Sequence, residues 1–277
     1  MTRQISGLSI IVTGGARGIG RATVERFARQ GASVAIGDLD PDLAAEVAET
    51  FGDRVAAARL DVTDPASWQE FLGEVAHLGP WDVLVNNAGI MPLGAVLKEP
   101  DSLTRAIFDV NVHGPINGIK AVTPGMVERG QGQIVNVASA VGRLAVADGA
   151  TYSASKFAVV GFSEAIRQEF APLGIDVSLI LPTVVQTELA AGVPAAKGMK
   201  PVTADDVAKA IESVVRKPRA EVWVPNWVQG PTKLTQALPR KVQDLLAKTN
   251  DAATVLTQAD PVARAAYEER ARRNEKK

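Results

Sequence analysis

The sequence predicts an α/β protein: one doubly wound domain with a seven-stranded parallel sheet flanked by helices. Two patterns lead to this prediction. Short apolar runs alternate with longer amphipathic stretches, which is typical of βαβ units around a parallel sheet. Most of the apolar runs are nearly continuous Val, Ile and Leu, as expected for strands buried on both faces. With 277 residues and no internal repeat or low-complexity linker, the chain is expected to form a single domain with a tail.

The expected elements follow one another in regular order. The strands are expected at Ser9–Thr13, Ser33–Gly37, Val55–Arg59, Val83–Asn86, Gln133–Ala138, Asp176–Leu181 and Glu221–Val224. The helices are expected at Gly20–Gln30, Asp42–Phe51, Ala66–Ala76, Leu103–Arg129, Tyr152–Ala171 and Ala204–Val215. This alternation is typical of a Rossmann-type sheet with helices on both faces. We therefore expect one domain over residues 1–225 and a mostly helical C-terminal extension over residues 226–277.

The composition excludes several classes of function. A formal net charge of -1 gives no sign of nucleic-acid binding. The absence of cysteine excludes disulfides, thiolate nucleophiles and cysteine-ligated zinc, and with only His77 and His113 no metal site is expected. The apolar run at the N-terminus is too short to span a bilayer and lacks a signal-peptide cleavage region, so we expect a cytoplasmic protein. The chemistry must then use Tyr, Lys, Ser, Asn, carboxylates or a bound cofactor.

A glycine-rich loop, TGGARGIG, joins the first expected strand to the first helix. Glycines in this place let peptide N–H groups face a pyrophosphate at a helix N-terminus. The spacing T-G-x-x-x-G-x-G differs from the common G-x-G-x-x-G fingerprint, and a purely structural turn is the alternative. The position between strand and helix favours nucleotide binding. The residues expected at the cofactor are Gly14, Arg17, Gly18, Ile19 and Gly20.

The end of the second strand bears on the choice of cofactor. Asp38 stands 18 residues after Gly20, where a carboxylate can accept hydrogen bonds from ribose hydroxyls and repel a 2′-phosphate. Arg17 is the counter-argument, because a guanidinium near the loop can pair with a phosphate. Since Leu39 beside Asp38 is not basic, the sequence favours NAD over NADP. A solvated Asp that starts a turn is the alternative.

Two further strand ends carry candidate cofactor residues. Asp61, followed by Val62, ends the third strand, where the carboxylate can bond an adenine amino group; alternatively it caps the next helix, although Asp64 and Ser67 are as well placed for that. The fourth strand ends in NNAG, and its Asn87, Ala88 and Gly89 suit a wall against which a cofactor lies. As a structural turn, NNAG would be unremarkable.

The segment YSASK carries the candidate acid–base chemistry. Tyr152 and Lys156 are four residues apart and share one face of a helix. A free tyrosine has a pKa of about 10, and we expect the ammonium of Lys156, with the charge of an oxidised nicotinamide, to lower it. Tyr152 would then exchange a proton with a substrate hydroxyl, and Lys156 would also bond the nicotinamide ribose. Ser139, at the carboxyl end of the fifth strand, is expected to bond the substrate oxygen.

Together these motifs resemble the short-chain dehydrogenase/reductase family over roughly residues 5–225. The matching elements, in order, are TGGARGIG, Asp38, Asp61-Val62, NNAG, Asn111, Ser139, and Tyr152 with Lys156. The resemblance implies a metal-free nicotinamide-binding domain that assembles as a homodimer or homotetramer through the helices expected at 103–129 and 152–171. It also implies that Asn111 bends its helix and holds a water next to Lys156, which makes Asn111, Ser139, Tyr152 and Lys156 the catalytic set.

One stretch departs from the family pattern. The family commonly has Pro-Gly after the sixth strand, whereas this sequence has LPTVVQTEL, in which Thr183 replaces the glycine. Pro182 and Thr187 are kept, and the resemblance implies that Thr187 bonds the carboxamide of the cofactor with help from the Val185 backbone. Thr183 is expected to add a side chain beside the nicotinamide and to change the shape of the loop.

The sequence favours an NAD-dependent oxidoreductase that interconverts an apolar secondary alcohol and its ketone. The segments expected to face the substrate, 91–96, 140–149 and 188–199, are mostly apolar. The alternatives are an NADP-dependent carbonyl or acyl reductase, against which Asp38 argues, and a catalytically weak NAD-binding sensor or scaffold. The substrate itself and the direction of the reaction are left open.

The role of the extension also stays open. Residues 226–277 hold ten Lys/Arg and six Asp/Glu, a net charge of +4. Packing on its own domain or across a subunit interface is favoured. Contact with a membrane surface, or with another partner through the basic residues, is the alternative.

Overall fold

A seven-stranded parallel sheet forms the centre of the protein, as the sequence predicts. The computed structural model describes residues 2–194, 201–243 and 251–273. The strands lie in the order β3-β2-β1-β4-β5-β6-β7 and pair in parallel throughout. Their bounds are β1 Ser9–Thr13, β2 Ser33–Asp38, β3 Val55–Arg59, β4 Val83–Asn86, β5 Gly132–Val137, β6 Ile175–Pro182 and β7 Glu221–Val224. Each lies within a residue or two of its expected position.

The strand order reverses between β1 and β4, and this reversal creates the place for a ligand. Ile10, Ile11 and Val12 of β1 pair with β2 on one side and with β4 on the other. The connections from β1 and from β4 leave the sheet in opposite directions, so a crevice opens beyond the carboxyl ends of these strands. The glycine loop follows β1 and the NNAG segment follows β4, so both border this crevice.

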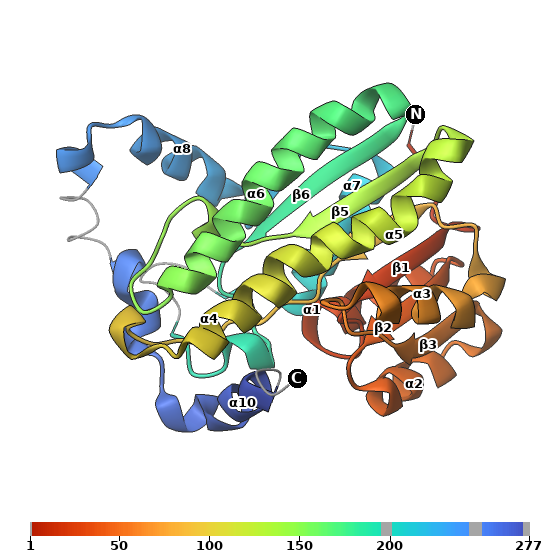
Figure 1. The fold of residues 1–277 in the computed structure, drawn as a ribbon. Coiled ribbons are helices and arrows are strands. Elements are labelled where there is room, and N and C mark those ends of the chain that lie inside the picture. The colour runs from red at the N-terminus through yellow and green to blue at the C-terminus, as the bar shows by residue number, and fades with distance from the viewer. Residues whose placement is uncertain (1, 195–200, 244–250, 274–277) are drawn as a thin grey trace.

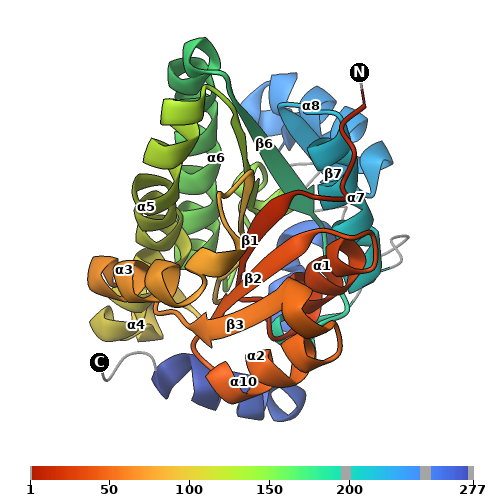
Figure 2. The same ribbon diagram turned by 90° about the vertical axis from the view of Figure 1, so that its right-hand side faces the viewer.

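Helices cover both faces of the sheet (Figures 1 and 2). On one face lie α1 Gly18–Ala28, α2 Pro41–Glu49 and α7 Ala204–Arg216; on the other lie α3 Pro65–Glu74, α4 Asp101–Phe108, α5 Gly114–Arg129 and α6 Ala150–Phe170. Asp64 caps α3 by accepting a 2.8 Å bond from the Ala66 amide, so of the three candidates for this cap it is Asp64 that fills the position.

Residues 101–129 are helical throughout, as expected over 103–129, with one π-helical turn at Asn111, where the family resemblance implies a bend. A π-helical turn, Asp109–His113, separates α4 from α5. The side chain of Asn111 explains the local break, because its amide exchanges two bonds with the backbone of Ile90, at 2.8 Å and 2.9 Å. π-helical turns of this kind are frequent at functional sites.

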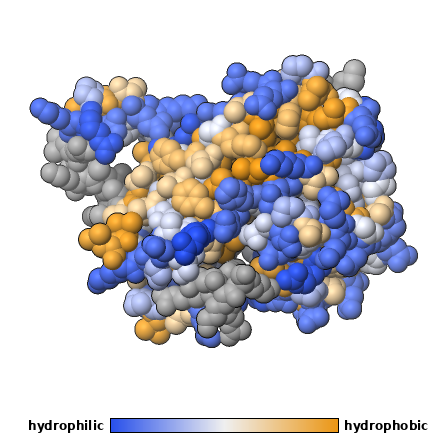
Figure 3. Space-filling model, viewed as in Figure 1, coloured by the Kyte–Doolittle hydropathy of each residue, from blue (hydrophilic) through white to orange (hydrophobic). Residues whose placement is uncertain are grey.

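The face formed by α5 and α6 has a broad apolar area (Figure 3). Val127 of α5 and Phe157 of α6 are large hydrophobic side chains that are 38% and 43% exposed. An apolar area of this kind on a folded domain marks a surface suited to contact with another molecule.

The C-terminal extension returns to the edge of the sheet where the strands end. Its described elements include η8 Asn226–Val228, α8 Gln229–Ala237, η9 Asp251–Gln258 and α10 Pro261–Arg273. In Figure 1, α8 projects from the body of the domain, whereas α10 lies against it near the segment that follows β6. Within the part of the chain that the structure describes, no helix is long and apolar enough to cross a membrane.

Candidate active site

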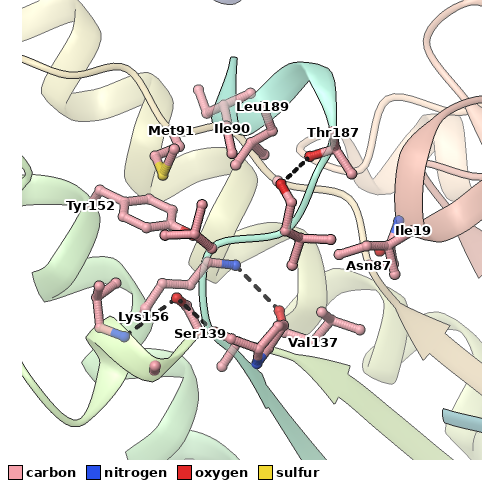
Figure 4. A pocket seen from close by; sticks show the side chains of 18 of the residues that line it. Ile19, Asn87, Ile90, Met91, Val137, Ser139, Tyr152, Lys156, Thr187 and Leu189 are labelled. Carbon is pink, nitrogen blue, oxygen red and sulfur yellow. Dashed lines mark hydrogen bonds between the residues drawn. The ribbon is translucent and has the colours of Figure 1, made fainter. Parts of the chain in front are cut away.

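A cavity of about 830 Å³ lies at the carboxyl ends of the strands. Its walls come from the glycine loop, from the segments that follow β2 to β6, from α6 and from the C-terminal extension. Figure 4 shows Tyr152, Lys156 and Ser139 grouped toward one side, with Ile19 and Asn87 on the other. The volume falls within the range of small-molecule and cofactor sites.

The glycine loop has a geometry that leaves backbone N–H groups free at the start of α1. Gly14 and Gly18 have φ angles of +64° and +52°, which side chains rarely tolerate. A Cβ atom on Gly20 would lie 2.0 Å from the Gly14 carbonyl oxygen, so only glycine fits there. No side chain of the described residues caps α1. The first amides of this helix therefore suit an anionic ligand, as the sequence predicts for a pyrophosphate.

Asp38 is held at the end of β2 by the backbone around it. Its two carboxylate oxygens accept one bond each, from the Ala16 amide at 3.0 Å and from the Asp40 amide at 3.1 Å. The guanidinium of Arg17 is engaged elsewhere, with Asp40 at 2.9 Å and with Glu188 at 3.5 Å. The negative charge of Asp38 therefore faces the cavity, while the positive charge of Arg17 is paired with two carboxylates.

The strand ends at β3 and β4 line the same cavity. Asp61 accepts two bonds from Thr63, from the backbone at 3.1 Å and from the hydroxyl at 2.7 Å, and so forms its own turn. The Asn87 amide reaches the carbonyls of Thr13 and Gly14, at 3.0 Å and 3.1 Å. Asn87 thus ties the segment after β4 to the glycine loop. Val62, Ala88 and Gly89 complete this wall.

The YSASK segment lies in the first turns of α6, and its two chemical groups face the cavity. Tyr152 and Lys156 are 6% and 5% exposed. The Lys156 ammonium lies 5.7 Å from the centre of the Tyr152 ring and donates a 3.2 Å bond to the Val137 carbonyl. Ser139 follows β5, accepts a 3.3 Å bond from the Val141 amide and donates a 3.4 Å bond to the Pro182 carbonyl.

Burial governs the acid–base properties of this pair. It raises the pKa of Tyr152 to about 12, an effect that the Ser139 hydroxyl beside it opposes. It also lowers the pKa of Lys156 to about 8. The sequence led us to expect that Lys156, with the charge of an oxidised nicotinamide, lowers the Tyr152 pKa, whereas the cost of burying a phenolate raises it here.

Asn111 lies behind the cavity wall rather than in it. The side chain is 1% exposed, and besides Ile90 it donates a 3.0 Å bond to the hydroxyl of Ser155 in α6. A Cβ atom on Gly89 would lie 3.1 Å from the Asn111 carbonyl oxygen and 3.5 Å from the Lys156 nitrogen. Asn111 and Lys156 therefore approach the same point from two sides, and Gly89 leaves room between them.

The segment after β6 brings three of the expected residues to the cavity. Pro182, Val185 and Thr187 line it, and Thr187 lies close to Gly18, whose Cβ atom would be 3.2 Å from the Thr187 methyl carbon. Thr183 also lines the cavity, but its backbone amide and its hydroxyl bond the Val224 carbonyl of β7 at 2.9 Å and 3.3 Å. The side chain in place of the family's glycine is thus tied to the sheet.

Of the cofactor-binding and catalytic residues expected from the sequence, all but Gly20 and Asn111 line the cavity. The segments expected to face the substrate line it only in part, through Met91, Ala140, Val141, 143–146, 188–190 and Val193, and residues 195–199 lie outside the described residues. Sequence reasoning missed the contribution of the C-terminal extension, because no local motif marks it. The cavity residues from the extension are Val228, Thr235, Gln236, Arg240, Gln243, Val255, Leu256, Tyr267 and Arg270. The chain has two tyrosines, Tyr152 and Tyr267, and both line this cavity. This scarcity of tyrosine was the one feature of the sequence that could have pointed to Tyr267.

Comparison with known proteins agrees with this geometry. The family model for short chain dehydrogenases matches residues 9–198. The chain is 38% identical over 199 residues to 2,5-dichloro-2,5-cyclohexadiene-1,4-diol dehydrogenase LinX of Sphingobium indicum, covering 70% of this chain and 79% of that protein. It is 38% identical over 195 residues to the 3-alpha-(or 20-beta)-hydroxysteroid dehydrogenase of Mycobacterium bovis, covering 70% and 75%. It is 36% identical over 194 residues to the sorbitol dehydrogenase of Cereibacter sphaeroides, covering 69% and 76%.

A solved structure shares the fold. It is a short chain dehydrogenase/reductase from Burkholderia phymatum in complex with NAD, with a TM-score of 0.77 and 24% identity, covering 84% of this chain and 94% of that one. The fold, the order of the motifs and the sequence relatives define one class of protein, an oxidoreductase built on a doubly wound sheet. The chain belongs to the short-chain dehydrogenase/reductase family.

Proposed function

We propose that this protein is an NAD-dependent oxidoreductase that interconverts an apolar secondary alcohol and its ketone, with Tyr152 as the general acid and base. One observation carries the proposal. The buried hydroxyl of Tyr152, with Lys156 and Ser139 beside it, opens into the same cavity as the uncapped N-terminus of α1 and the carboxylate of Asp38. A cofactor held at α1 and a substrate held at Tyr152 would therefore meet.

The residues of the chain suit NAD. The amides at the start of α1 would hold the pyrophosphate, and Asp38 would accept bonds from the ribose hydroxyls. Arg17 is paired with Asp40 and Glu188, and the carboxylate of Asp38 would repel a 2′-phosphate. We assign Asn87, Thr187 and the Val185 backbone to the nicotinamide end. When bound, NAD would supply the hydride-transfer chemistry.

Tyr152 and the side chains around it have distinct roles in the reaction. With a pKa of about 12 the phenol rests in its neutral form, ready to donate a proton to a ketone oxygen in the reduction. Oxidation needs the phenolate, which a positive charge next to Tyr152 favours. Ser139 would donate to the substrate oxygen and orient it, Lys156 would hold the ribose, and Asn111 would support Lys156 through its bond to the neighbouring Ser155.

The substrate end of the cavity is apolar. Met91, Val141, Leu144, Val146 and Leu189 line it. Relatives of this chain are named for a chlorinated cyclohexadiene diol and for hydroxysteroids. We infer a secondary alcohol or ketone on a ring or another apolar body as the substrate class.

Initial rates test the proposal. The protein is assayed with NAD and with NADP against a panel of cyclic apolar secondary alcohols, and formation of the reduced cofactor is followed by absorbance. We expect turnover with NAD, and a kcat/KM at least about tenfold lower with NADP because of the charge on Asp38. Binding of NAD without turnover of any alcohol or ketone would favour the sensor alternative.

A further inference from the structure

The far end of the C-terminal extension forms part of the cavity wall, although it lies beyond residue 198, where the family match ends. Val255 and Leu256 of η9 are buried against Leu93, Val146 and Val193. A Cβ atom on Gly149 would lie 2.6 Å from a methyl carbon of Leu256, so the extension packs closely on the loop before α6. This contact closes the apolar, substrate-facing end of the cavity.

A buried arginine fixes α10 in this position. Arg264 is 3% exposed, and its guanidinium donates to the Met91 carbonyl at 2.7 Å and to the carbonyls of Leu189 and Ala191 at 3.1 Å each. Its remaining bond is to the Glu268 carboxylate at 3.0 Å. The planar guanidinium with its fixed donors thus connects α10 to the segments after β4 and after β6.

Arg264 holds α10 in a position where Tyr267 lines the cavity. The Tyr267 ring lies 5.1 Å from the Arg264 guanidinium, and the Tyr267 hydroxyl accepts a 2.6 Å bond from the Met91 amide. Burial raises the pKa of Tyr267, and a negative charge on the nearby Tyr152 would raise it further. A phenol can accept and also donate, and among the described residues no group takes the proton of Tyr267. The cavity therefore holds a second phenol, whose hydroxyl can donate a hydrogen bond to a ligand.

We propose that the C-terminal extension completes the substrate site, with Tyr267 as a specificity-determining hydrogen-bond donor and Arg264 as the residue that positions it. The inference rests on the proposed function, because it assigns the substrate end of that same site. The preferred substrate then has an apolar body, which packs on Val255 and Leu256, and two oxygens. One oxygen reacts at Tyr152, and the other accepts a bond from Tyr267.

The chemistry of the cavity supports this substrate class. Val255, Leu256 and Val146 offer no polar partner, so an alcohol with several unpaired polar groups would be penalised there. A single buried donor discriminates strongly between a substrate that has an acceptor in reach and an isostere that lacks it. Tyr267 is such a donor, and its position is set by Arg264 and the Met91 amide rather than by the substrate.

The test compares 4-propylcyclohexanol with its two ether isosteres, 4-ethoxycyclohexanol and 4-(methoxymethyl)cyclohexanol, in wild-type protein and Tyr267→Phe. We expect the variant to lower kcat/KM for the better ether about five- to tenfold and for the propyl compound less than about threefold. The dissociation constant for NAD stays unchanged. Val262→Ala, on the exposed side of α10, is the matched control and leaves all three alcohols unaffected.

Arg264→Met tests the positioning role. Arg264 does not line the cavity and acts only by holding α10 in position. We therefore expect its loss to raise KM for all three alcohols, while kcat and the affinity for NAD change little. A loss of NAD affinity, or a fall in kcat with KM unchanged, would overturn the role of Arg264 in the substrate site.

The outcomes separate this inference from the proposed function. If Tyr267→Phe lowers kcat/KM equally for the ethers and the propyl compound, or for none of them, the donor role is refuted while the oxidoreductase stands. If the wild-type protein turns over no alcohol, the proposed function fails, and the same three alcohols are compared by ligand-observed NMR with NAD present. Weaker binding of an ether alone to Tyr267→Phe would still support the donor role, and equal binding or none would refute it.

Discussion

Among single residues, Lys156 shows how function and stability conflict at this site. Burial lowers its pKa from 10.5 to about 8, so between these values the unfolded chain binds a proton that the folded protein does not. Stability therefore rises with pH across this window, and below about pH 8 the folded protein carries the full cost of a buried ammonium. A side chain selected for stability alone would be uncharged here.

Lys156→Met should remove this pH dependence. Without added cofactor, the unfolding free energy of wild type relative to the variant should rise by on the order of 3 kcal/mol between pH 8 and 10.5, since one pKa unit corresponds to about 1.4 kcal/mol. Urea denaturation of both proteins at several pH values measures the difference. A difference that is constant with pH would show that the Lys156 pKa is not lowered. The variant should also lose turnover, because it cannot hold the ribose.

Asp38 is the residue on which the cofactor preference depends. Asp38→Ser removes the charge that would repel a 2′-phosphate but keeps an oxygen for the Ala16 amide. We expect the ratio of kcat/KM with NADP to that with NAD to rise about tenfold or more. Asp42→Ser, in the first turn of α2 and outside the cavity, is the control and should leave the ratio unchanged. An unchanged ratio in Asp38→Ser would show that another residue determines the preference for NAD over NADP.

At the scale of elements, the turn between β1 and α1 depends on close backbone contact. Gly20→Ala would place a Cβ atom 2.0 Å from the Gly14 carbonyl oxygen, and backbone cannot move aside cheaply. We expect the variant to lose NAD binding by at least about tenfold and to unfold at a lower temperature. Gly73→Ala in α3 is the control: nothing lies within 4 Å of its Cβ position.

The two glycine variants should change stability in opposite directions. Alanine at Gly73 should stabilise the protein slightly, by up to about 1 kcal/mol, because it restricts the unfolded chain and favours the helix. Thermal unfolding and an NAD titration of each variant provide the comparison. If Gly20→Ala behaves like Gly73→Ala, the close approach of α1 to the glycine loop does not constrain the site.

For the whole molecule, the apolar face of α5 and α6 is a surface suited to contact with another protein. We propose that it is covered by a second copy of the chain, as the family resemblance implies for these helices. Light scattering should give a mass two or four times 29.1 kDa, and Phe157→Ser, which makes the exposed face polar, should shift the mass downward. A single 29.1 kDa species for the wild type would contradict the assembly.

The sequence predicted what depends on local spacing and missed what depends on distant contacts. The strands were predictable from continuous apolar runs, and many of the residues that line the cavity from local motifs such as the glycine loop, in which Gly14 and Gly20 approach each other closely. The π-helical turn at Asn111 agrees with the bend that the family resemblance implies there, but its contacts with Ile90 and Ser155, which are distant in sequence, were not predictable from spacing. The position of Tyr267 was missed for the same reason, since Met91 is 176 residues away.

Tyr152→Phe tests whether Tyr152 exchanges the proton with the substrate. NAD-dependent oxidation of the best alcohol is measured beside wild type, and NAD affinity is measured separately by titration. We expect kcat to fall about 10²- to 10⁴-fold while the dissociation constant for NAD stays within about twofold, because the ring is kept and only the acid–base group is lost. A Tyr152→Phe protein that retains a kcat within about threefold of wild type would show that another group exchanges the proton.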